Sequence, residues 1–158
     1  MSVIIRKALL SDVPALSDMS VRGRIFHNRL LNNYFADINP ETEKSFLEKV
    51  VTDEDKMCFI ALKDDIAVGM LFCFFKTLPF LRRPSVCHVD TLFVDEKCRN
   101  QGIGRLLMQN LKEICLRQGV DEIELAVYEG NDKALSFYRS MGFAAKKQEL
   151  KLDLHSEN

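Results

Sequence analysis

The stretch Arg99-Asn-Gln-Gly-Ile-Gly104 decides the fold of this chain, because it lies between an apolar run that ends at Val94 and a segment with helical periodicity. Glycines at 102 and 104 allow the backbone to turn tightly, so that successive amide N–H groups can converge on an anion. The positive end of the following helix adds to this attraction. The stretch therefore predicts a strand, a pyrophosphate-binding loop and a helix, in that order.

Two other phosphate-binding loops do not fit these residues. A P-loop requires a lysine and then Ser or Thr directly after its last glycine, and neither follows Gly104. A dinucleotide-binding loop requires a third glycine three residues beyond Gly104, where this chain has Leu107. The spacing therefore favours a different class of pyrophosphate ligand.

A second motif lies downstream, where residues 131–143 read Asn-Asp-Lys-Ala-Leu-Ser-Phe-Tyr-Arg-Ser-Met-Gly-Phe. This segment resembles the Asn-x-x-Ala-x-x-Phe-Tyr-x-x-x-Gly-Phe segment of the GNAT superfamily of N-acetyltransferases. Arg99, Gly102 and Gly104 match that family's Gln/Arg-x-x-Gly-x-Gly/Ala motif, which binds the pyrophosphate of acetyl-CoA. The two motifs occur in the expected order, and the resemblance extends more loosely over residues 3–154.

The resemblance implies a mixed α/β fold with a largely antiparallel central sheet flanked by helices. The sheet is expected to open between the strands that end at Val94 and Val127, where acetyl-CoA would enter. The chain has 158 residues, of which 47% are hydrophobic and 28% charged, and this suits one domain with its own core. We therefore expect a single N-acetyltransferase domain over residues 1–158, with its core at about 3–154.

Periodicity, capping residues and turn residues predict the individual elements. Gly69 is typical of a bulge, and residues 148–154 alternate polar and apolar side chains as an edge strand would. The segment 22–39 permits a helix without requiring one, and by resemblance it borders the acceptor site. Strands are expected at 3–8, 56–63, 66–76, 86–94, 122–127 and 148–154, and helices, with their capping residues, at 11–21, 39–51, 105–118 and 132–141.

Charge and composition argue against several classes of function. The net charge is -1 and the basic and acidic residues are interleaved, so neither a nucleic-acid nor a membrane-surface partner is expected. The N-terminus has no long apolar segment, which predicts neither a signal peptide nor a membrane-spanning helix and favours the cytoplasm. A homodimer is common in the family that the chain resembles, and the sequence shows no decisive interface stripe.

The five cysteines include no Cys-x-x-Cys pair and are interpreted as reduced thiols. A sharper alternative makes Cys87 or Cys98 the nucleophile of an acyl-cysteine intermediate, whereas a small buried apolar residue is the simpler interpretation. The three histidines, at 27, 88 and 155, are scattered along the sequence. No metal site is predicted.

The resemblance also assigns residues to the acetyl-CoA site. Main-chain groups of the strand before the loop would line the pantetheine and polarise the thioester. Asn131 would bind the pantetheine arm, although its side chain can equally cap the helix at Asp132. The expected acetyl-CoA-binding residues are Leu92, Phe93, Val94, Arg99, Asn100, Gln101, Gly102, Ile103, Gly104, Arg105, Asn131, Ala134 and Tyr138.

Three side chains are candidates for acid–base catalysis. Tyr138 matches the tyrosine that is proposed to protonate the CoA thiolate in the family, although it also fits a core residue beside Phe137. A regular strand over 86–94 would place His88, Asp90, Leu92 and Val94 on one face. His88 and Asp90 would then be neighbours, either as a proton-accepting pair or as a structural contact, and water is a third choice of base.

These residues together predict direct transfer of an acetyl group from acetyl-CoA to a primary amine. A non-catalytic acyl-CoA sensor is one alternative, and absence of turnover with any amine would favour it. A nucleotide-binding protein that uses the same glycine loop is another, and stabilisation by ATP or NAD would identify it. The sequence leaves the acceptor amine, the base, the oligomeric state and the use of other acyl-CoAs open.

Overall fold

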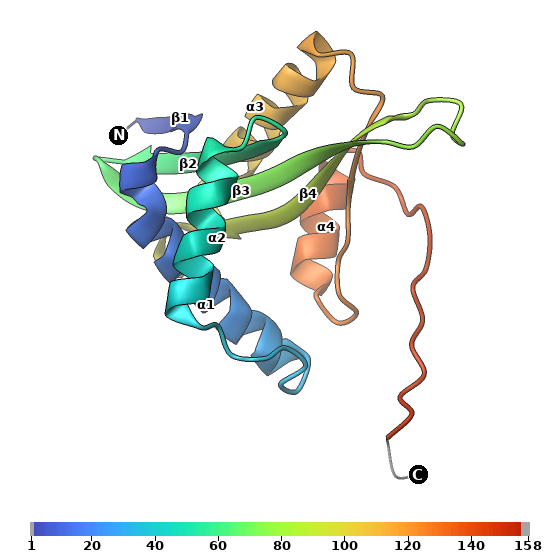
Figure 1. Ribbon diagram of the computed structural model, residues 1–158, viewed down its shortest axis with the longest axis horizontal. Coiled ribbons are helices and arrows are strands. Elements are labelled where there is room, and N and C mark those ends of the chain that lie inside the picture. Colours follow the sequence, from blue (N-terminus) through green and yellow to red (C-terminus); the bar gives the residue numbers. More distant parts are fainter. Residues whose placement is uncertain (1, 156–158) are drawn as a thin grey trace. The chain divides into compact units, whose positions relative to one another are not determined.

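The computed structural model describes residues 2–155 (Figure 1). The chain forms two compact units, Met1–Ala126 and Val127–Asn158, and each is described separately. The first unit contains the sheet, the helices packed on it and the glycine loop. The second contains one helix and the C-terminal segment.

A five-stranded sheet forms the centre of the first unit, with its strands side by side in chain order. The first four strands are antiparallel to their neighbours and the fifth runs parallel to the fourth. The predicted mixed sheet, largely antiparallel, is therefore confirmed. The strands are β1 (Val3–Lys7), β2 (Lys56–Lys63), β3 (Ile66–Thr77), β4 (Ser85–Val94) and β5 (Glu122–Leu125).

Helices cover both faces of this sheet. α1 (Val13–Leu30) and α2 (Pro40–Thr52) lie on one face, and α3 (Ile103–Arg117) lies on the other (Figure 1). Short 3-10 turns, η1 (Leu10–Asp12) and η2 (Glu96–Cys98), precede α1 and follow β4. The core under α1 and α2 includes Leu16, Met19, Leu47 and Ile60, all at most 2% exposed.

α1 continues well beyond its predicted end at residue 21. The first half buries Val13, Leu16 and Met19, and this spacing predicts a helix. The second half is held by polar contacts, because the Asn28 side chain exchanges two hydrogen bonds with the backbone of Phe35. Such contacts produce no apolar periodicity in the sequence. For this reason the sequence of residues 22–39 permits a helix without requiring one.

Local chemistry explains the remaining turns and caps. Asn39 Oδ1 accepts hydrogen bonds from the N–H groups of Glu41 and Thr42, as an N-cap does. Asp64 and Asp65 both have positive φ angles, 51° and 61°, which suits the two-residue hairpin predicted there. A bulge lies beside Gly69, and a Cβ on that glycine would lie 3.0 Å from the Phe93 carbonyl oxygen.

A second bulge interrupts β4 at Asp90. Phe72 pairs with Thr91, whereas the next residue, Cys73, pairs with Val89, so Asp90 has no partner in β3. An extra residue of this kind reverses the side-chain alternation on its two sides. The predicted sharing of one face by His88, Asp90, Leu92 and Val94 is therefore wrong.

Cross-strand pairs show which face each half of β4 presents. His88 pairs with Phe74, which packs on the core under α1 and α2. Leu92 pairs with Leu71, and Val94 pairs with Gly69, whose Cβ position lies next to α3. Paired residues share a face, so His88 faces the α1 and α2 side and Leu92 and Val94 face α3.

The second unit contains α4 (Asp132–Ser140), which Asn131 caps and which Gly142, with φ of 94°, follows two residues after its end. No strand follows α4 in the described residues, so the predicted edge strand at 148–154 is wrong. Leu150, Leu152 and Leu154 are 91%, 83% and 80% exposed. Alternating side chains produce a strand only where another strand supplies hydrogen bonds, and within the second unit the described residues contain no strand.

Candidate active site

The glycine loop leads directly into the N-terminus of α3. Asn100 and Gly102 have positive φ angles of 61° and 81°, and Gly102 is the N-cap residue. A Cβ on Gly102 would meet nothing within 4 Å, so the position is open. The first bond inside the helix runs from the Leu106 N–H to the Gly102 carbonyl. The N–H groups of Ile103 and Gly104 precede it and have no partner within the helix.

No side chain of the described residues caps this end, and the first turn of α3 contains no acidic residue. A helix that begins in this way presents N–H donors and a positive dipole end to an incoming anion. Gln101 lies to the side, where its Oε1 accepts a hydrogen bond from Lys63 Nζ at 2.8 Å. The predicted strand, loop and helix are therefore present, with a geometry suited to a phosphate group.

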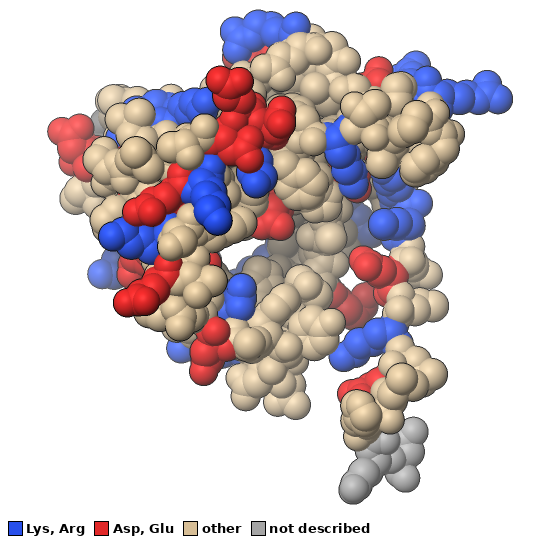
Figure 2. Space-filling view, viewed as in Figure 1, with Lys and Arg blue, Asp and Glu red and all other residues tan. Residues whose placement is uncertain are grey.

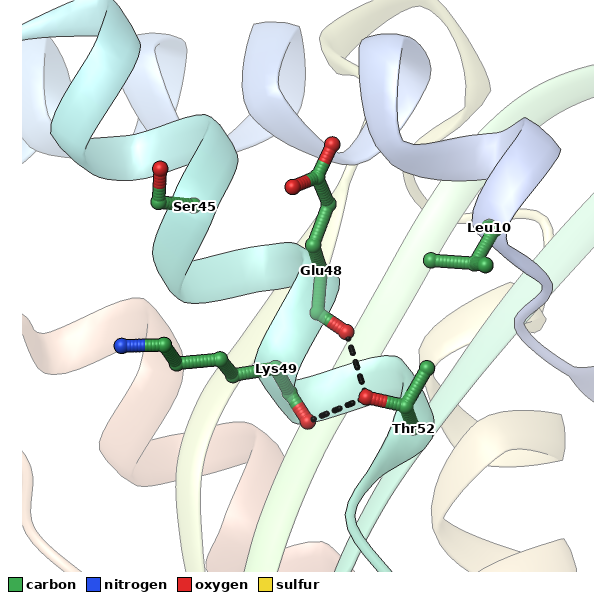
Figure 3. Close-up of a pocket in the computed structure, with 5 residues that line it drawn as sticks. All are labelled: Leu10, Ser45, Glu48, Lys49 and Thr52. Carbon is green, nitrogen blue, oxygen red and sulfur yellow. Dashed lines mark hydrogen bonds between the residues drawn. The ribbon is translucent and has the colours of Figure 1, made fainter.

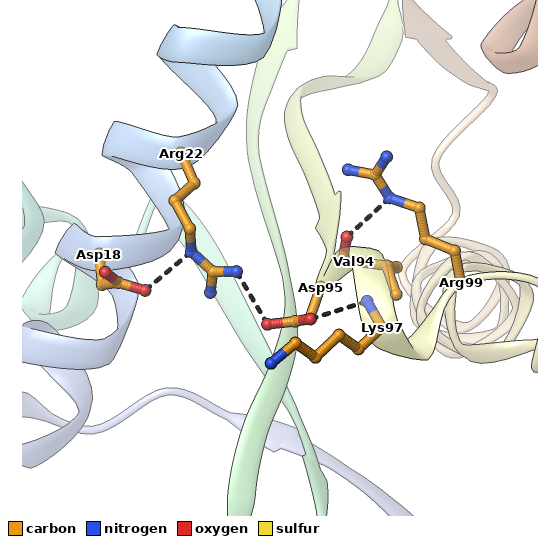
Figure 4. Close-up of polar contacts among 6 residues, drawn as sticks. All are labelled: Asp18, Arg22, Val94, Asp95, Lys97 and Arg99. Carbon is orange, nitrogen blue, oxygen red and sulfur yellow. Dashed lines mark hydrogen bonds and ion pairs between the residues drawn. The ribbon is translucent and has the colours of Figure 1, made fainter.

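A network of charged side chains holds the approach to the loop (Figure 4). Asp95 Oδ1 accepts a hydrogen bond from the Lys97 N–H at 2.9 Å, and Asp95 Oδ2 accepts one from Arg22 Nη1 at 2.8 Å. Arg22 Nε also donates to Asp18. The hydrogen bond from Arg22 lowers the pKa of Asp95 below its usual value.

Arg99 contacts the end of β4 and α1, close to the same network. Its Nε donates to the Val94 carbonyl at 3.0 Å, and its guanidinium lies 5.8 Å from the centre of the Phe26 ring. A pocket of about 350 Å³ lies between α1 and the segment after β4. It is lined by Arg22, Ile25, Phe26, Arg29, Asp95, Glu96 and Lys97.

The sheet opens at the loop end of β4. Pairing between β4 and β5 stops at Val89 and Leu125, although β4 continues to Val94. Residues 90–94 therefore have no β5 partner within the described chain. Binding of the pantetheine by main-chain groups of Leu92, Phe93 and Val94 stays a prediction.

A charged cluster lies near the paired end of β4, on the α1 and α2 side. His88 Nδ1 is 3.6 Å from Glu124 Oε2, and the other oxygen of Glu124 is 2.7 Å from Lys76 Nζ. The His88 ring stacks on Phe74 with 4.9 Å between ring centres. His88 and Glu124 side chains are only 24% and 13% exposed. In the described residues, no group is within hydrogen-bond distance of His88 Nδ1.

The structure brings His88 to Glu124 and not to Asp90. Asp90 is exposed on the bulge, where one oxygen accepts a hydrogen bond from Thr91 Oγ1 at 3.0 Å. Sequence reasoning missed Glu124, because its proximity depends on the parallel pairing of His88 with Glu124 across β4 and β5. The alternation Glu122-Ile-Glu-Leu125 was the available signal.

Tyr138 and Asn131 belong to the second unit. The Tyr138 ring lies edge-on to Phe137 and Phe143, with ring centres 5.2 Å and 5.6 Å away. Burial raises the pKa of Tyr138 to about 12, so its hydroxyl keeps its proton at neutral pH. Asn131 Oδ1 accepts a hydrogen bond from the Ala134 N–H at 3.3 Å, which confirms its capping role.

The cysteines do not support an acyl-enzyme at residue 87. Cys87 is fully buried. Its contact with the Cys115 thiol lowers its pKa, but the contact with Cys73 and burial outweigh this and raise the pKa to about 12. A thiol in this state is a poor nucleophile. Cys98 is partly exposed in η2 and lies in the segment between β4 and the loop.

A second hollow, of about 490 Å³, lies between η1 and α2 (Figure 3). The Thr52 hydroxyl at its end is 2.9 Å from the Glu48 carbonyl and 3.2 Å from the Lys49 carbonyl, so its hydrogen-bonding capacity is used locally. None of the residues expected at the active site lines this hollow. It offers no chemistry that the loop and β4 do not already provide.

Three further observations concern surface charge, membrane-spanning helices and metal-binding groups. On the face shown in Figure 2, basic and acidic side chains are interspersed. Within residues 2–155, no helix has the length and apolar character needed to cross a bilayer. The same residues contain no group of three or more His, Cys, Asp or Glu side chains arranged to bind a metal ion. Location in the cytoplasm stays a prediction.

Within the described residues, an opened sheet edge is thus followed by a helix N-terminus without a side-chain cap, an arrangement compatible with an extended ligand that carries a phosphate group. The family model described as Acetyltransferase (GNAT) family matches residues 25–143. This chain therefore belongs to the GNAT acetyltransferase family, and the family predicted from the two motifs is confirmed.

Individual relatives agree with this membership. L-ornithine N5-acetyltransferase NATA1 of Arabidopsis thaliana is 26% identical over 71% of this chain, and the match covers 50% of the plant protein, about half its length. L-amino acid N-acetyltransferase AaaT of Escherichia coli is 27% identical over 89% of this chain and 82% of its own length. A solved structure, the tetramutant of the BH1408 protein from Bacillus halodurans, is 26% identical with a TM-score of 0.88, covering 96% of this chain and 99% of that one.

Proposed function

We propose that this protein transfers an acetyl group from acetyl-CoA to a primary amine by direct attack of the amine on the thioester. The observation that carries the proposal is the combination of the N-terminus of α3, which lacks a side-chain cap, with the unpaired edge of β4. Acetyl-CoA is the co-substrate of the family. One end of it is an anion and its pantetheine arm is an extended chain with amide groups, so it matches both features.

Binding of the donor is assigned to the loop and to β4. The N–H groups of residues 102–104 receive the pyrophosphate, and Arg99, Asn100, Gln101 and Arg105 surround it. Main-chain groups of Leu92, Phe93 and Val94 bind the pantetheine and orient the thioester carbonyl. By resemblance to the family, Asn131 binds the pantetheine arm or the adjoining backbone, and Ala134 belongs to the same donor site. Gly102 suits the loop because its positive φ and open surroundings favour a residue without a side chain.

The acceptor must lose a proton before it attacks. A primary amine titrates near ~10, so well under a hundredth of it is nucleophilic at neutral pH. His88 is proposed as the group that accepts this proton, since its Nδ1 lacks a hydrogen-bond partner among the described residues and lies 3.6 Å from Glu124. Asp90, on the bulge, and water are the competing choices.

The leaving thiolate needs less assistance. Thiol pKa values lie near ~8.5, so a thiolate is a tolerable leaving group at neutral pH. As the carbon–nitrogen bond forms and the carbon–sulfur bond breaks, Tyr138 donates its hydroxyl proton to the sulfur and is reprotonated from solvent. Its pKa of about 12 keeps it protonated until that step but makes it a weak acid. A modest contribution to the rate is therefore expected.

The acceptor class is proposed from charge and from the relatives. Arg22 is neutralised by Asp18 and Asp95, and Arg24 donates to the Ala36 carbonyl and lies over the Phe35 ring. Neither arginine is therefore a strong candidate for binding a substrate carboxylate, and Arg29, at the pocket, is the better one. The two relatives are named for ornithine and L-amino acids, so amino acids head the list of acceptors to test.

The experiment is release of CoA thiol from acetyl-CoA across amino acids, polyamines, aminoglycosides and short peptides, with thermal shifts for acetyl-CoA, ATP and NAD. We expect one responsive acceptor class and stabilisation by acetyl-CoA. Stabilisation without turnover would favour a non-catalytic acyl-CoA sensor. Stabilisation by ATP or NAD alone would contradict the proposal and favour a nucleotide-binding protein.

A further inference from the structure

The His88 ring is held by side chains of both neighbouring strands. β3, β4 and β5 lie side by side, and Phe74, His88 and Glu124 occupy one register position across them. Paired residues share a face, so all three side chains lie on the α1 and α2 side. The ring stacks on Phe74 with 4.9 Å between ring centres, and its Nδ1 lies 3.6 Å from Glu124 Oε2. The imidazole therefore has an aromatic ring against its plane and a carboxylate at its Nδ1 edge.

Glu124 is itself fixed by a second charged contact. Its Oε1 lies 2.7 Å from Nζ of Lys76, which follows Phe74 by two residues in β3 and so lies on the same face. The Glu124 side chain is only 13% exposed, and a carboxylate at that burial costs free energy unless it is paired. Lys76 supplies the opposite charge at one oxygen, while the other oxygen faces His88. The ion pair thus determines which carboxylate oxygen meets the imidazole.

The two ring nitrogens of His88 have different surroundings. Nδ1 is buried, although 24% of the side chain is exposed. The exposed part of the ring therefore lies away from Nδ1, and Nε2 is the nitrogen that an acceptor amine can reach. A neutral imidazole carries one proton, and the hydrogen bond made by one nitrogen sets the state of the other. A carboxylate at Nδ1 favours the Nδ1–H form and leaves the Nε2 lone pair available.

We propose that Glu124 is a positioning residue of the acetyl transfer, which holds His88 in the Nδ1–H form and directs Nε2 toward the acceptor amine. The inference rests on the proposed function, in which His88 accepts the ammonium proton. That proton passes from the acceptor nitrogen to Nε2, and the nitrogen lone pair becomes free to attack the thioester carbon. The imidazolium keeps its Nδ1–H toward Glu124, whose negative charge stabilises it until Nε2 releases the proton to solvent.

The distance between Nδ1 and Oε2 suits a contact that tightens during catalysis. At 3.6 Å it is longer than a hydrogen bond. Hydrogen bonds of catalytic groups commonly shorten when substrate binds. A small movement of either side chain closes the gap, because the stacked Phe74 ring and the Lys76 ion pair already restrain the two partners.

The first test determines the tautomer of His88 without turnover. Glu124→Gln keeps the shape of the side chain but has one amide oxygen and one NH2 group. Lys76 can only donate hydrogen bonds, so it binds the amide oxygen and turns the NH2 group toward Nδ1, which moves the ring proton to Nε2. Heteronuclear NMR of isotope-labelled histidine reports this change, at about pH 8.5 where an ordinary imidazole is neutral.

We expect the ring proton of His88 on Nδ1 in the wild type and on Nε2 in Glu124→Gln. The signal is assigned by its disappearance in His88→Gln. A wild-type ring with its proton on Nε2 would overturn the proposal, and this measurement requires no variant to fold. The same tautomer in the wild type and in Glu124→Gln would overturn it as well.

Rates then show whether Glu124 acts through His88. Glu124→Gln should lower kcat about tenfold to a hundredfold and leave the KM of acetyl-CoA nearly unchanged. In a His88→Gln background the same change should have no further effect, because residues that act as a unit are not additive. Glu122→Gln, on the same strand and paired with Val86, is the matched control and should leave kcat unchanged. An equal loss of kcat from Glu124→Gln in both backgrounds would overturn the proposal.

The inference and the proposed function fail in different ways. If an amine is acetylated while wild-type His88 carries its proton on Nε2, the function stands and the role of Glu124 is wrong. If no amine is acetylated while the tautomer changes as expected, the proposed function is wrong and the orientation of His88 by Glu124 is upheld.

Discussion

Arg22 Nη1 lies 2.8 Å from Asp95 Oδ2, and this contact joins the middle of α1 to the first residue after β4. The two residues are 73 positions apart in the sequence. Asp95 also accepts a hydrogen bond from the Lys97 N–H, so the same carboxylate shapes the turn that leads to the glycine loop. The position of the loop therefore depends on a side chain of α1.

Asp95→Asn should weaken acetyl-CoA binding several-fold, because the loop loses its charged link to α1. Since both partners are partly exposed, the loss in free energy of unfolding should be small, about 0.5–1 kcal/mol. Calorimetric titration and urea unfolding measure the two effects. Asp18→Asn removes the more exposed partner of Arg22, 66% exposed, and serves as the control. Unchanged affinity in Asp95→Asn would contradict the role assigned to the contact.

The pH dependence of this contact follows from the lowered pKa of Asp95. The hydrogen bond from Arg22 causes that shift, so the carboxylate stabilises the folded state above its unfolded pKa of ~3.9. The contribution is lost as the pH falls through the lower folded pKa. We expect the gap in unfolding free energy between wild type and Asp95→Asn to be full above about pH 5 and to close at lower pH. A difference in unfolding free energy that grows as the pH falls would contradict the lowered pKa of Asp95.

His88→Gln and Asp90→Asn distinguish the candidate bases. If His88 accepts the proton, His88→Gln should lower kcat/KM by about 10²-fold, while Asp90→Asn should change it little because Asp90 is exposed on the bulge. Steady-state rates at saturating acetyl-CoA provide the measurement. The reverse ranking would assign the base to Asp90, and near-normal rates in both variants would assign it to water.

Tyr138→Phe tests the proton donor. We expect kcat to fall about tenfold, since a thiolate leaves without full protonation, whereas the dissociation constant of acetyl-CoA should stay nearly unchanged. Both kcat and the dissociation constant must be measured, because the affinity for acetyl-CoA alone does not report on proton transfer to the thiolate. Undiminished turnover in this variant would leave Tyr138 as a packing residue between Phe137 and Phe143.

Gly104→Val tests the phosphate site. A branched side chain in the first turn of α3 should crowd the pyrophosphate and reduce acetyl-CoA affinity by at least a hundredfold. Folding should be nearly unaffected, because glycine and valine are both weak helix formers. Thermal unfolding without ligand is the internal control for calorimetric titration, and retained affinity would place the phosphates elsewhere.

Features that depend on a few neighbouring residues were predictable from the sequence. Asn39 caps α2, Asp64 and Asp65 form the turn between the strands expected at 56–63 and 66–76, and Gly119, with φ of 71°, directly follows the helix expected at 105–118. The loop at 99–104 was equally accessible because its glycines and the following helix are local. These predictions need no knowledge of what lies beside each strand.

Features that depend on the neighbouring strand were not predictable. The bulge at Asp90 exists only in the register between β3 and β4, and it invalidated the face assignment of residues 88–94. Glu124 reaches His88 through parallel pairing of two strands that are separated by α3. The alternation of residues 148–154 is typical of a strand, yet the described residues form none there, because a strand needs a partner that supplies hydrogen bonds.

In the proposed function, the bulge at Asp90 also divides β4 into two parts that contact different molecules. Before it, residues 86–89 pair with both β3 and β5, and His88 faces α1 and α2; after it, residues 91–94 keep an edge that β5 does not occupy. If the acyl donor meets the second part as proposed, side chains of the first part can be exchanged without disturbing the donor-binding backbone. The proposed function therefore predicts that acceptor preference can be changed separately from donor binding, beginning with the α1-facing side chains of residues 86–89.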